Sequence, residues 1–226
     1  VYNHRSFSYS GGGIVGPIVG TVLLTVGAIL IALFFGVSAA IYLSEYSKQS
    51  PFIHAVRLAI LNLAGVPSIV FGLFGFSVFV LAVPIITNDP ASRSLLSFPI
   101  FIGDYVVSFQ GWNSSLMAGC ATLACMILPV IITASEESLR AVPQGFRDAS
   151  LAMGATRWQT VHDHVLPYST GGILTGVILA MARGAGEVAP LMLVGVVKLA
   201  PTLPFDGSAP FLHMDRKFMH LGFHVY

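Results

Sequence analysis

The sequence predicts an all-α integral membrane protein built as a polytopic helical bundle, and three observations support this prediction. Hydrophobic residues make up 55% of the 226-residue chain and charged residues only 9%, whereas a soluble domain carries about 25% charged residues. The mean hydropathy is +0.81. Four apolar stretches are each long enough to cross a hydrocarbon core, which takes about 20 residues. The net charge of +1 argues against a nucleic-acid-binding protein, because such proteins carry basic surfaces.

The four apolar stretches are expected to form spans within a single transmembrane domain that covers residues 1–226. These spans lie at about 14–43, 59–86, 115–134 and 171–197. Small residues recur in them and allow helix backbones to approach closely in lipid; the pairs are Gly16/Gly20, Gly72/Gly75 and Gly172/Gly176. Prolines are expected to kink or end the helices; they are Pro67, Pro84, Pro129 and Pro190. A packed bundle is therefore predicted.

Basic residues in the connecting loops predict which loops lie inside the cell. Lys48 and Arg57 lie in the 44–58 loop and only Arg93 lies in the 87–114 loop, whereas the 135–170 loop carries three arginines. Because cytoplasmic loops are enriched in Lys and Arg, we expect the 44–58 and 135–170 loops to be cytoplasmic. The chain starts at Val1 without a methionine and ends at Tyr226 without a polar tail, so we expect a fragment of a longer protein.

The 135–168 loop is unusually long and predicts two short helices. The acids after Ser135 are typical of a helix start, and Pro143 interrupts the first helix. Thr156 is expected to cap a second helix, which buries Trp158 and stops at Pro167. One reading is an amphipathic hairpin resting on the lipid surface. Such helices usually have a basic polar face, whereas this loop has four acids against three arginines. A docking surface for another protein is the preferred interpretation.

Within this loop, the segment DASLAMGATRWQTVHDHVLP resembles the signature of permease subunits of bacterial ABC importers (E-A-A, three residues, G, nine residues, I, one residue, L-P). The matching positions are Asp148, Ala149, Ser150, Gly154, Leu166 and Pro167. Two residues depart from the pattern: Asp148 stands for the usual glutamate, and His164 replaces an aliphatic residue. The resemblance implies a type I, MetI-like bundle whose cytoplasmic coupling helix sits in a groove on an ATPase. His164 is expected to weaken packing in the second helix.

Longer segments are similar to phosphate-importer permeases of the PstA type: Arg57 to Gly75, Glu136 to Val161 and Gly171 to Leu191. This resemblance implies six spans, of which this chain would lack the first and the last. It also implies a multi-pass location in the bacterial cytoplasmic (inner) membrane. The implied partners are membrane lipid, a second PstC-like permease, a dimer of PstB-like ATPase subunits and an extracytoplasmic PstS-like phosphate-binding protein. ATP and Mg would be used by the ATPase, so this chain is expected to bind no cofactor.

Two charged residues in the fourth predicted span form a candidate substrate pathway. Arg183 and Glu187 are four positions apart, so on a continuous helix they share one face. A charge at the middle of the membrane costs about 2.5–3.5 kcal/mol on insertion scales. The pair is either a structural ion pair or part of the route, in which Arg183 meets an oxyanion and Glu187 weakens its binding. Arginine suits phosphate because its planar fork donates two hydrogen bonds.

The motifs that are missing argue against an enzyme. The sequence contains no G-x-x-x-x-G-K-[ST] for binding ATP and no G-x-S-x-G for nucleophilic catalysis. His213, His220 and His224 are interpreted as loop residues, and no metal site is predicted. The favoured function is therefore the permease subunit of an ATP-driven phosphate importer that works by alternating access. Two alternatives stay open: a permease for another oxyanion, such as molybdate or sulfate, and an ATP-independent channel or secondary transporter.

Overall fold

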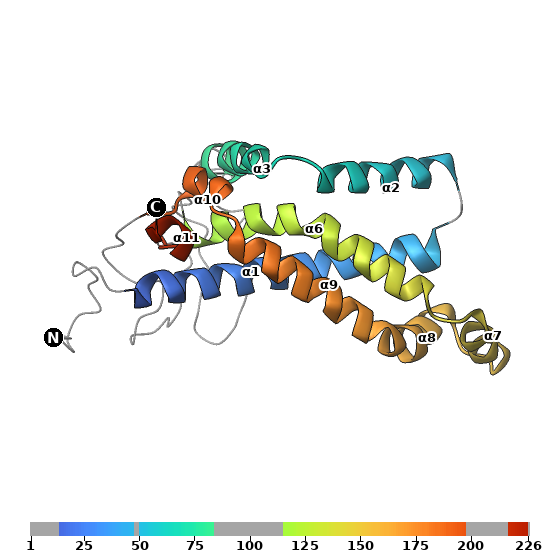
Figure 1. Ribbon diagram of the computed structural model, residues 1–226. Helices are drawn as coiled ribbons and strands as arrows, with labels where there is room; N and C mark the ends of the chain where they lie inside the picture. Colours follow the sequence, from blue (N-terminus) through green and yellow to red (C-terminus); the bar gives the residue numbers. More distant parts are fainter. Residues whose placement is uncertain (1–13, 48–49, 84–114, 198–216, 226) are drawn as a thin grey trace, which may run out of the picture. The chain divides into compact units, whose positions relative to one another are not determined.

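The computed structural model describes residues 14–47, 50–83, 115–197 and 217–225 (Figure 1). Regular structure in these ranges is helical, apart from one isolated parallel bridge between Val196 and Phe218. The predicted all-α membrane fold is therefore confirmed.

In three places a short π-helical stretch (η) directly extends an α-helix. The described elements are α1 (Val15–Ile41), η1 (Tyr42–Tyr46), α2 (Pro51–Ala64), α3 (Ser68–Gly75), η2 (Phe76–Ala82), α6 (Leu116–Arg140), α7 (Gln144–Ala152), α8 (Arg157–Thr160), η3 (Val161–Val165), α9 (Leu166–Gly186), α10 (Ala189–Val194) and α11 (Leu221–Val225).

Three helical stretches of the described residues are long and apolar enough to cross a membrane: Val15–Tyr46, Leu116–Arg140 and Arg157–Gly186. Counting Pro51–Ala64 and Ser68–Ala82 as one broken span gives a fourth. The stretches predicted at 59–86 and 171–197 are thus not continuous helices.

The breaks have local causes. Asn62 and Leu63 carbonyls accept the Gly65 N–H at the end of α2, and Pro67, which has no N–H to donate, precedes α3. The second break follows Gly186, and Pro190 then occupies the first turn of α10, where its missing N–H has no helical partner to lose. The helix through Pro129 continues unbroken, whereas Pro84 lies outside the described residues.

The described residues form two compact units. The first takes its residues from Val1–Ala28, Pro67–Leu123 and Ala185–Tyr226, and the second from Ile29–Val66 and Ala124–Gly184. Helices α1, α6 and α9 contribute residues to both units.

Glycines bring backbones together in the first unit, as their small size predicts. A Cβ on Gly20 would overlap the carbonyl of Met219, and a Cβ on Gly72 would lie 2.7 Å from the Cα of Pro190. The second contact lets α3 lie against α10 (Figure 1). Around these contacts the core consists of fully buried apolar side chains, among them Leu24, Leu116, Leu123, Leu191 and Phe218.

The second unit contains the later parts of α1 and α6, nearly all of α9, helix α2 and the segment 141–165. Ala40, Leu139, Val142 and Val165 form one buried apolar cluster, and Leu43, Ile53 and Ile132 form another. Close helix contact again depends on glycine: a Cβ on Gly172 would overlap Ser138, and a Cβ on Gly176 would lie 2.5 Å from that of Ala134. The packing role predicted for Gly172/Gly176 is confirmed.

Candidate functional site

Four signature residues, Asp148 to Ser150 and Gly154, lie in a helical hairpin, residues 141–165, which contains α7, α8 and η3 and belongs to the second unit. The other two, Leu166 and Pro167, begin α9. The start of the hairpin differs from the prediction. Ser135 and Glu136 do not begin a helix, because α6 continues through them to Arg140. The Glu136 carboxylate is paired there with Arg57 and Arg140, so this acid is accommodated inside the helix. The hairpin therefore begins after Arg140.

The end of the hairpin also differs from the prediction. Pro167 does not stop the second helix, since α9 begins at Leu166 and runs to Gly186. The preceding stretch, Val161–Val165, is π-helical. A π turn replaces the regular α-helical bonds by bonds one residue longer, so Pro167, which has no N–H to donate, follows a stretch where the regular pattern is already interrupted. The hairpin thus runs directly into a long apolar helix.

Gly154, the glycine of the signature, forms the turn after α7. Its φ is +89°, a left-handed conformation that glycine adopts without steric cost. The Gly154 N–H donates to the Leu151 carbonyl at 3.0 Å, and the Ala155 N–H donates to the Ser150 carbonyl at 3.2 Å. These two bonds are those of a Schellman motif, which ends a helix with glycine at the position after its cap. The signature therefore requires glycine here for a backbone reason.

Thr156 begins the second helix of the hairpin as predicted. Its side chain accepts from the Gln159 N–H at 3.3 Å, and the Gln159 side chain accepts from the Thr156 N–H at 2.8 Å. This reciprocal pair is a capping box, which satisfies two N–H groups that have no partner within the helix. The two helices are also joined by a buried contact of 2.9 Å between the Ser150 and Thr160 hydroxyls.

Replacing Thr156 by alanine is expected to loosen the first turn of α8. Loss of such a cap costs about 1 kcal/mol, which corresponds to roughly fivefold faster exchange of the Gln159 amide. Hydrogen–deuterium exchange measured by mass spectrometry checks this. Thr175→Ala is the control, because the Thr175 hydroxyl donates only to the Gly171 carbonyl of its own helix. Equal exchange rates in this turn for both variants would contradict the capping role.

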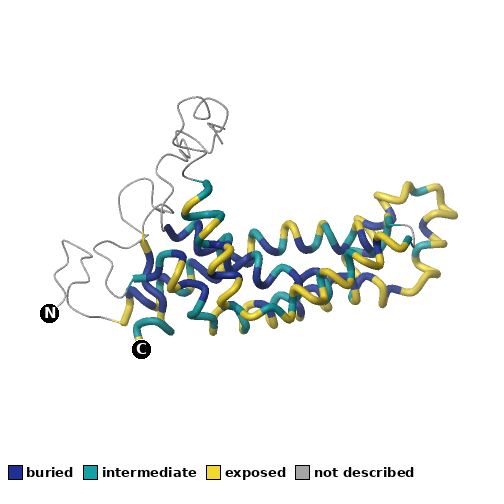
Figure 2. Tube along the Cα trace, turned by 90° about the horizontal axis from the view of Figure 1, so that it is seen from above, coloured by how far each residue is buried: buried dark blue, intermediate teal, exposed yellow. Residues whose placement is uncertain are grey.

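The surface of the hairpin is rich in exposed apolar side chains, and Figure 2 shows this end of the second unit mostly exposed. Met153 is 89% exposed, and Phe146 and Leu151 are also exposed. Trp158, predicted to be buried, is 60% exposed. Its ring lies against that of His162, with centroids 5.9 Å apart, and the hairpin offers it no apolar interior. These apolar side chains therefore face outward.

The other signature residues divide between surface and interior. Asp148 and Ala149 are exposed, Ser150 is buried, Leu166 is partly buried and Pro167 is exposed. His164, which replaces an aliphatic residue of the signature, is exposed. The expected loss of packing at His164 is therefore wrong, because this side chain has no interior position to fill.

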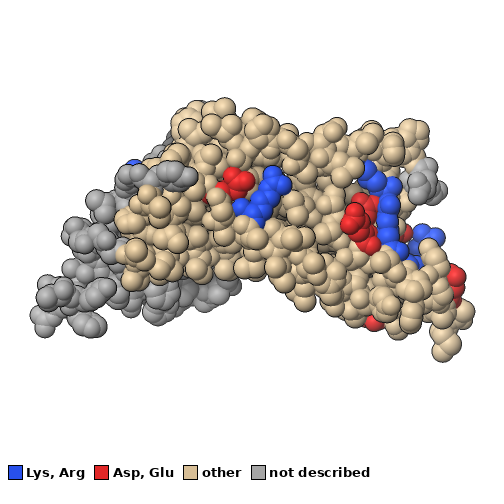
Figure 3. Space-filling view, in the orientation of Figure 1, with Lys and Arg blue, Asp and Glu red and all other residues tan. Residues whose placement is uncertain are grey.

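Ion pairs that the sequence did not predict join the hairpin to η1 and α6 to α2 within the second unit. Glu45 on η1 pairs with Arg147 on α7 at 2.7 Å. Glu136 pairs with Arg57 on α2 at 2.8 Å and with Arg140 at 2.7 Å. Figure 3 shows acidic and basic side chains together beside the hairpin on a largely uncharged surface. The two loops predicted to be cytoplasmic thus meet at one end of the unit, as that topology requires.

The two residues of the candidate substrate pathway do not lie in one continuous helix. Arg183 is partly buried in the last turn of α9, whereas Glu187 follows the end of this helix at Gly186. The expectation that both lie on one face of a continuous helix is therefore wrong, because the helix ends between them. Gly184 and Gly186 lower helix propensity at this end. Among the described residues of its own unit, Arg183 forms no ion pair.

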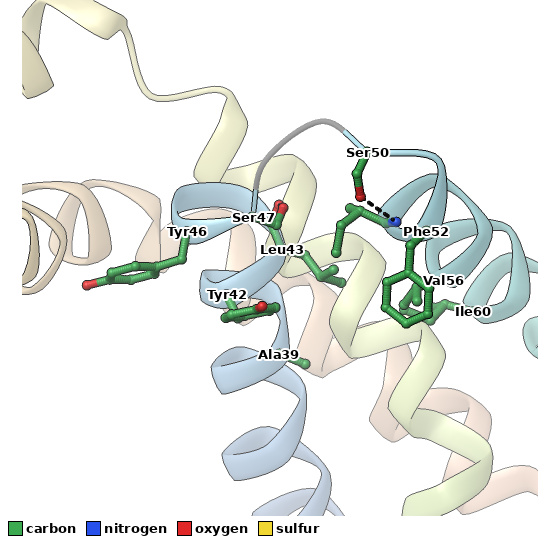
Figure 4. Close-up of a pocket in the computed structure, with 10 residues that line it drawn as sticks. Ala39, Tyr42, Leu43, Tyr46, Ser47, Ser50, Phe52, Val56 and Ile60 are labelled. Atoms are coloured by element: carbon green, nitrogen blue, oxygen red, sulfur yellow. Dashed lines mark hydrogen bonds between the residues drawn. The ribbon is translucent and has the colours of Figure 1, made fainter.

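A groove of about 530 Å³ lies elsewhere in the second unit, between η1 and α2 (Figure 4). Tyr42, Tyr46 and Phe52 line it together with aliphatic residues and the hydroxyl groups of Ser47 and Ser50. None of its lining residues is charged, so it differs chemically from an anion route. Ser50 caps α2 by accepting from the Ile53 N–H at 3.4 Å.

The histidines interpreted as loop residues have different positions. His220 is a loop residue as predicted, directly before α11, and its side chain is only 1% exposed in the first unit. Its Nδ1 accepts from the Gly222 N–H at 3.2 Å, which fixes the ring at the start of α11. The loop interpretation was wrong for His224, which lies in α11 itself, and His213 lies outside the described residues. No group of three metal-ligating side chains occurs among the residues that the structure describes.

The similarity of this chain to known proteins extends well beyond the signature. The PstA phosphate transport system permease protein of Yersinia pestis is 33% identical over 187 residues, 83% of this chain and 54% of that protein. PstA of Mycobacterium leprae is 33% identical over 198 residues, 87% of this chain and 56% of that protein. The probable ABC transporter permease protein YqgI of Bacillus subtilis is 29% identical over 202 residues, 89% and 59% of the two chains.

The chain thus spans a little over half the length of these relatives, and the predicted resemblance to PstA-type permeases is confirmed. The family model for the binding-protein-dependent transport system inner membrane component matches residues 32–204. This match includes the hairpin and the apolar helices α6 and α9. The chain therefore belongs to the family of binding-protein-dependent transport system inner membrane components and is a multi-pass protein of the inner membrane.

Proposed function

We propose that this chain is part of the permease subunit of an ATP-driven importer of inorganic phosphate. The observation that carries the proposal is the exposed 141–165 hairpin, in which Gly154 of the permease signature forms a Schellman turn and apolar side chains face outward. The names of its relatives from Yersinia pestis and Mycobacterium leprae support phosphate as the substrate. The chain itself acts as a membrane component rather than an enzyme, and the ATPase partner uses the ATP and Mg.

The apolar surface of the hairpin is suited to a protein partner. Phe146, Leu151 and Met153 are exposed on or directly after α7, and apolar side chains at the centre of an interface supply much of its binding energy. The hairpin also carries Asp148 and Arg157, so polar groups can form the rim of such an interface. The ATPase dimer is the proposed occupant. A second permease and an extracytoplasmic phosphate-binding protein complete the complex.

Alternating access follows from how the hairpin joins the unit. Its second helix continues through Pro167 into α9, and its first helix is ion-paired to η1 at the end of α1. A displacement imposed on the hairpin by closure of the ATPase dimer would therefore move both long helices. In alternating access the permease has two arrangements, open to one side of the membrane or to the other. ATP shifts the equilibrium between these arrangements only as far as the complex binds ATP more tightly in one of them.

Uptake into vesicles that contain the full complex tests the importer. We expect phosphate uptake to require ATP and the ATPase subunit, and to be inhibited more by arsenate than by sulfate or molybdate. Uptake that persists without ATP and without the ATPase subunit would show a channel or a secondary transporter instead. Transport of sulfate or molybdate in place of phosphate would identify a permease for another oxyanion.

For the substrate pathway, we propose that Arg183 contacts the transported anion and that Glu187 limits the strength of this contact. Arg183 is partly buried in an apolar helix. A charge in such a helix is energetically costly, so ionisable residues found there are usually paired or functional. Replacing Arg183 by glutamine is expected to lower phosphate uptake at least about tenfold, because a hydrogen bond to a charged group contributes roughly 1.5–3 kcal/mol.

Initial rates of radiolabelled phosphate uptake measure this effect at equal amounts of assembled complex. Met181→Gln is the matched control, because it places the same side chain on α9 two residues away. Arg183→Lys keeps the charge but loses the planar fork, so an intermediate rate is expected. A normal rate in Arg183→Gln, with normal assembly, would reduce Arg183 to a structural role.

A further inference from the structure

Arg147 lies on α7 but its side chain points away from the exposed face of the hairpin. Its side chain is 12% exposed, whereas the next two residues, Asp148 and Ala149, are exposed. The guanidinium donates to the Glu45 carboxylate from Nη2 at 2.7 Å and from Nε at 3.2 and 3.3 Å. The Glu45 side chain is also 12% exposed, so the pair is shielded from water.

The same guanidinium also binds the end of α6. Nη1 donates to the Val142 carbonyl at 2.6 Å, and Nη2 donates to the Leu139 carbonyl at 2.8 Å. The last carbonyls of a helix have no partner within it, and a cation at this end is favoured by the helix dipole. Arg147 therefore joins three segments through one planar group: α7, the end of α6 and η1, which extends α1.

A π-helical turn at the end of α1 provides the acidic partner. Residues Tyr42–Tyr46 are π-helical, and the Ser47 N–H donates to the Tyr42 carbonyl at 2.9 Å. π turns are rare and often occur at functional sites. Arg57 holds this turn from the other side, by donating to the Leu43 carbonyl at 2.8 Å. Glu45 is thus held in place by the fold rather than free to follow Arg147.

We propose that Arg147 and Glu45 are a positioning pair that transmits movement of the hairpin to the ends of α1 and α6. This inference rests on the proposed function, in which the ATPase moves the hairpin. The hairpin has a covalent route into α9, because η3 runs directly into that helix. Its connection to α1 is not covalent, so it depends on side chains, and the Arg147–Glu45 pair is the ionic link between α7 and η1.

Lysine cannot replace the arginine in this role. Its ammonium group is a single point, whereas the guanidinium donates from three nitrogens in a fixed plane to the carboxylate and two carbonyls. Arg147→Lys therefore keeps the charge opposite Glu45 and loses the simultaneous bonds. The matched control is Arg140→Lys, because Arg140 also pairs with a glutamate at 2.7 Å but has a half-exposed side chain and no bond to α7.

The experiment measures phosphate taken up per ATP hydrolysed by the full complex in proteoliposomes. In Arg147→Lys we expect this ratio to fall at least about fivefold, with ATP hydrolysis still present and the amount of complex unchanged. In Arg140→Lys we expect the ratio of the unaltered protein. A normal ratio in Arg147→Lys would overturn the inference. If Arg147→Lys lowers the amount of complex, Glu45→Gln is tested instead, because it leaves both carbonyl bonds of Arg147 in place.

The double variant Glu45→Gln/Arg147→Lys tests whether the two residues act through their mutual contact or independently of each other. If the two residues act through their contact, the double variant is no worse than the more impaired single variant. Multiplied defects would contradict a single positioning pair. Failure of the proposed function gives a different result: the unaltered complex would then show no ATP-driven phosphate uptake. A coupling defect confined to the variants is distinguishable from that outcome.

Discussion

Replacing Gly154 by valine is expected to lower both phosphate uptake and stimulated ATP hydrolysis. Gly154 has a φ of +89°, and a β-branched residue held in such a conformation costs about 1–3 kcal/mol. The strain is relieved if the Schellman turn opens, which breaks the bonds of Gly154 and Ala155 to the end of α7. Because α7 would then lose its fixed direction, we expect phosphate uptake and stimulated ATP hydrolysis to fall at least about tenfold.

Two control variants separate the effect of the positive φ at Gly154 from the effect of adding a side chain to the hairpin. Gly154→Asn is expected to keep much of the activity, because asparagine tolerates positive φ better than other non-glycine residues. Gly145→Val changes another glycine of the hairpin, at a position with ordinary φ and no neighbouring atom within 4 Å of an added Cβ. Stimulated hydrolysis and uptake are measured on the purified complex. Unaltered stimulation in Gly154→Val would show that the turn is not needed for coupling.

Replacing Gly176 by leucine is expected to prevent stable packing of α9 on α6. An added Cβ at this buried position would lie 2.5 Å from the Ala134 Cβ. A methyl group fixed to the backbone cannot rotate away, so the helices must separate. Overpacking of this kind costs about 1–3 kcal/mol, and in lipid the lost van der Waals contact is the main force between helices. We expect little monodisperse complex in detergent and a lower melting temperature.

Gly171→Leu is the matched control on the same helix, because a Cβ at Gly171 has no neighbouring atom within 4 Å. The amount of monodisperse complex is measured by fluorescence-detected size-exclusion chromatography and its melting by differential scanning fluorimetry. Gly171→Leu is expected to match the unaltered protein in both measurements. Equal behaviour of the two variants would mean that the α6–α9 contact tolerates separation.

Features of the hairpin that depend on neighbouring residues could be predicted from the sequence. Thr156 was expected to cap a helix, and it does so through a capping box with Gln159. Gly154 matched the signature, and its role as a Schellman turn involves residues no more than five positions apart. The start predicted at Ser135 and the stop predicted at Pro167 failed. Glu136 is paired with Arg140 within α6 and with Arg57 on α2, and Pro167 follows a π-helical stretch.

The candidate substrate pathway shows where the helical repeat is an insufficient guide. Arg183 and Glu187 share a face only if the helix continues through both, and α9 ends at Gly186. Gly184 and Gly186 favour a helix end before Glu187, but glycine is also common within membrane helices, so they do not predict the end by themselves. The exposure of Trp158 was missed for a related reason: an aromatic residue at helical spacing fits either an interior or a partner surface equally well.

The sequence by itself determined the membrane class, the family signature and the capping residues of the hairpin, because hydropathy and local hydrogen bonds depend on composition and on near neighbours. Only the tertiary structure decided which groups meet across the second unit. Glu45 and Arg147 are 102 positions apart, and Arg57 and Glu136 are 79 positions apart. No local spacing relates such residues. Their pairing exists because packed helices bring charged side chains together where water is excluded and an unpaired charge is costly.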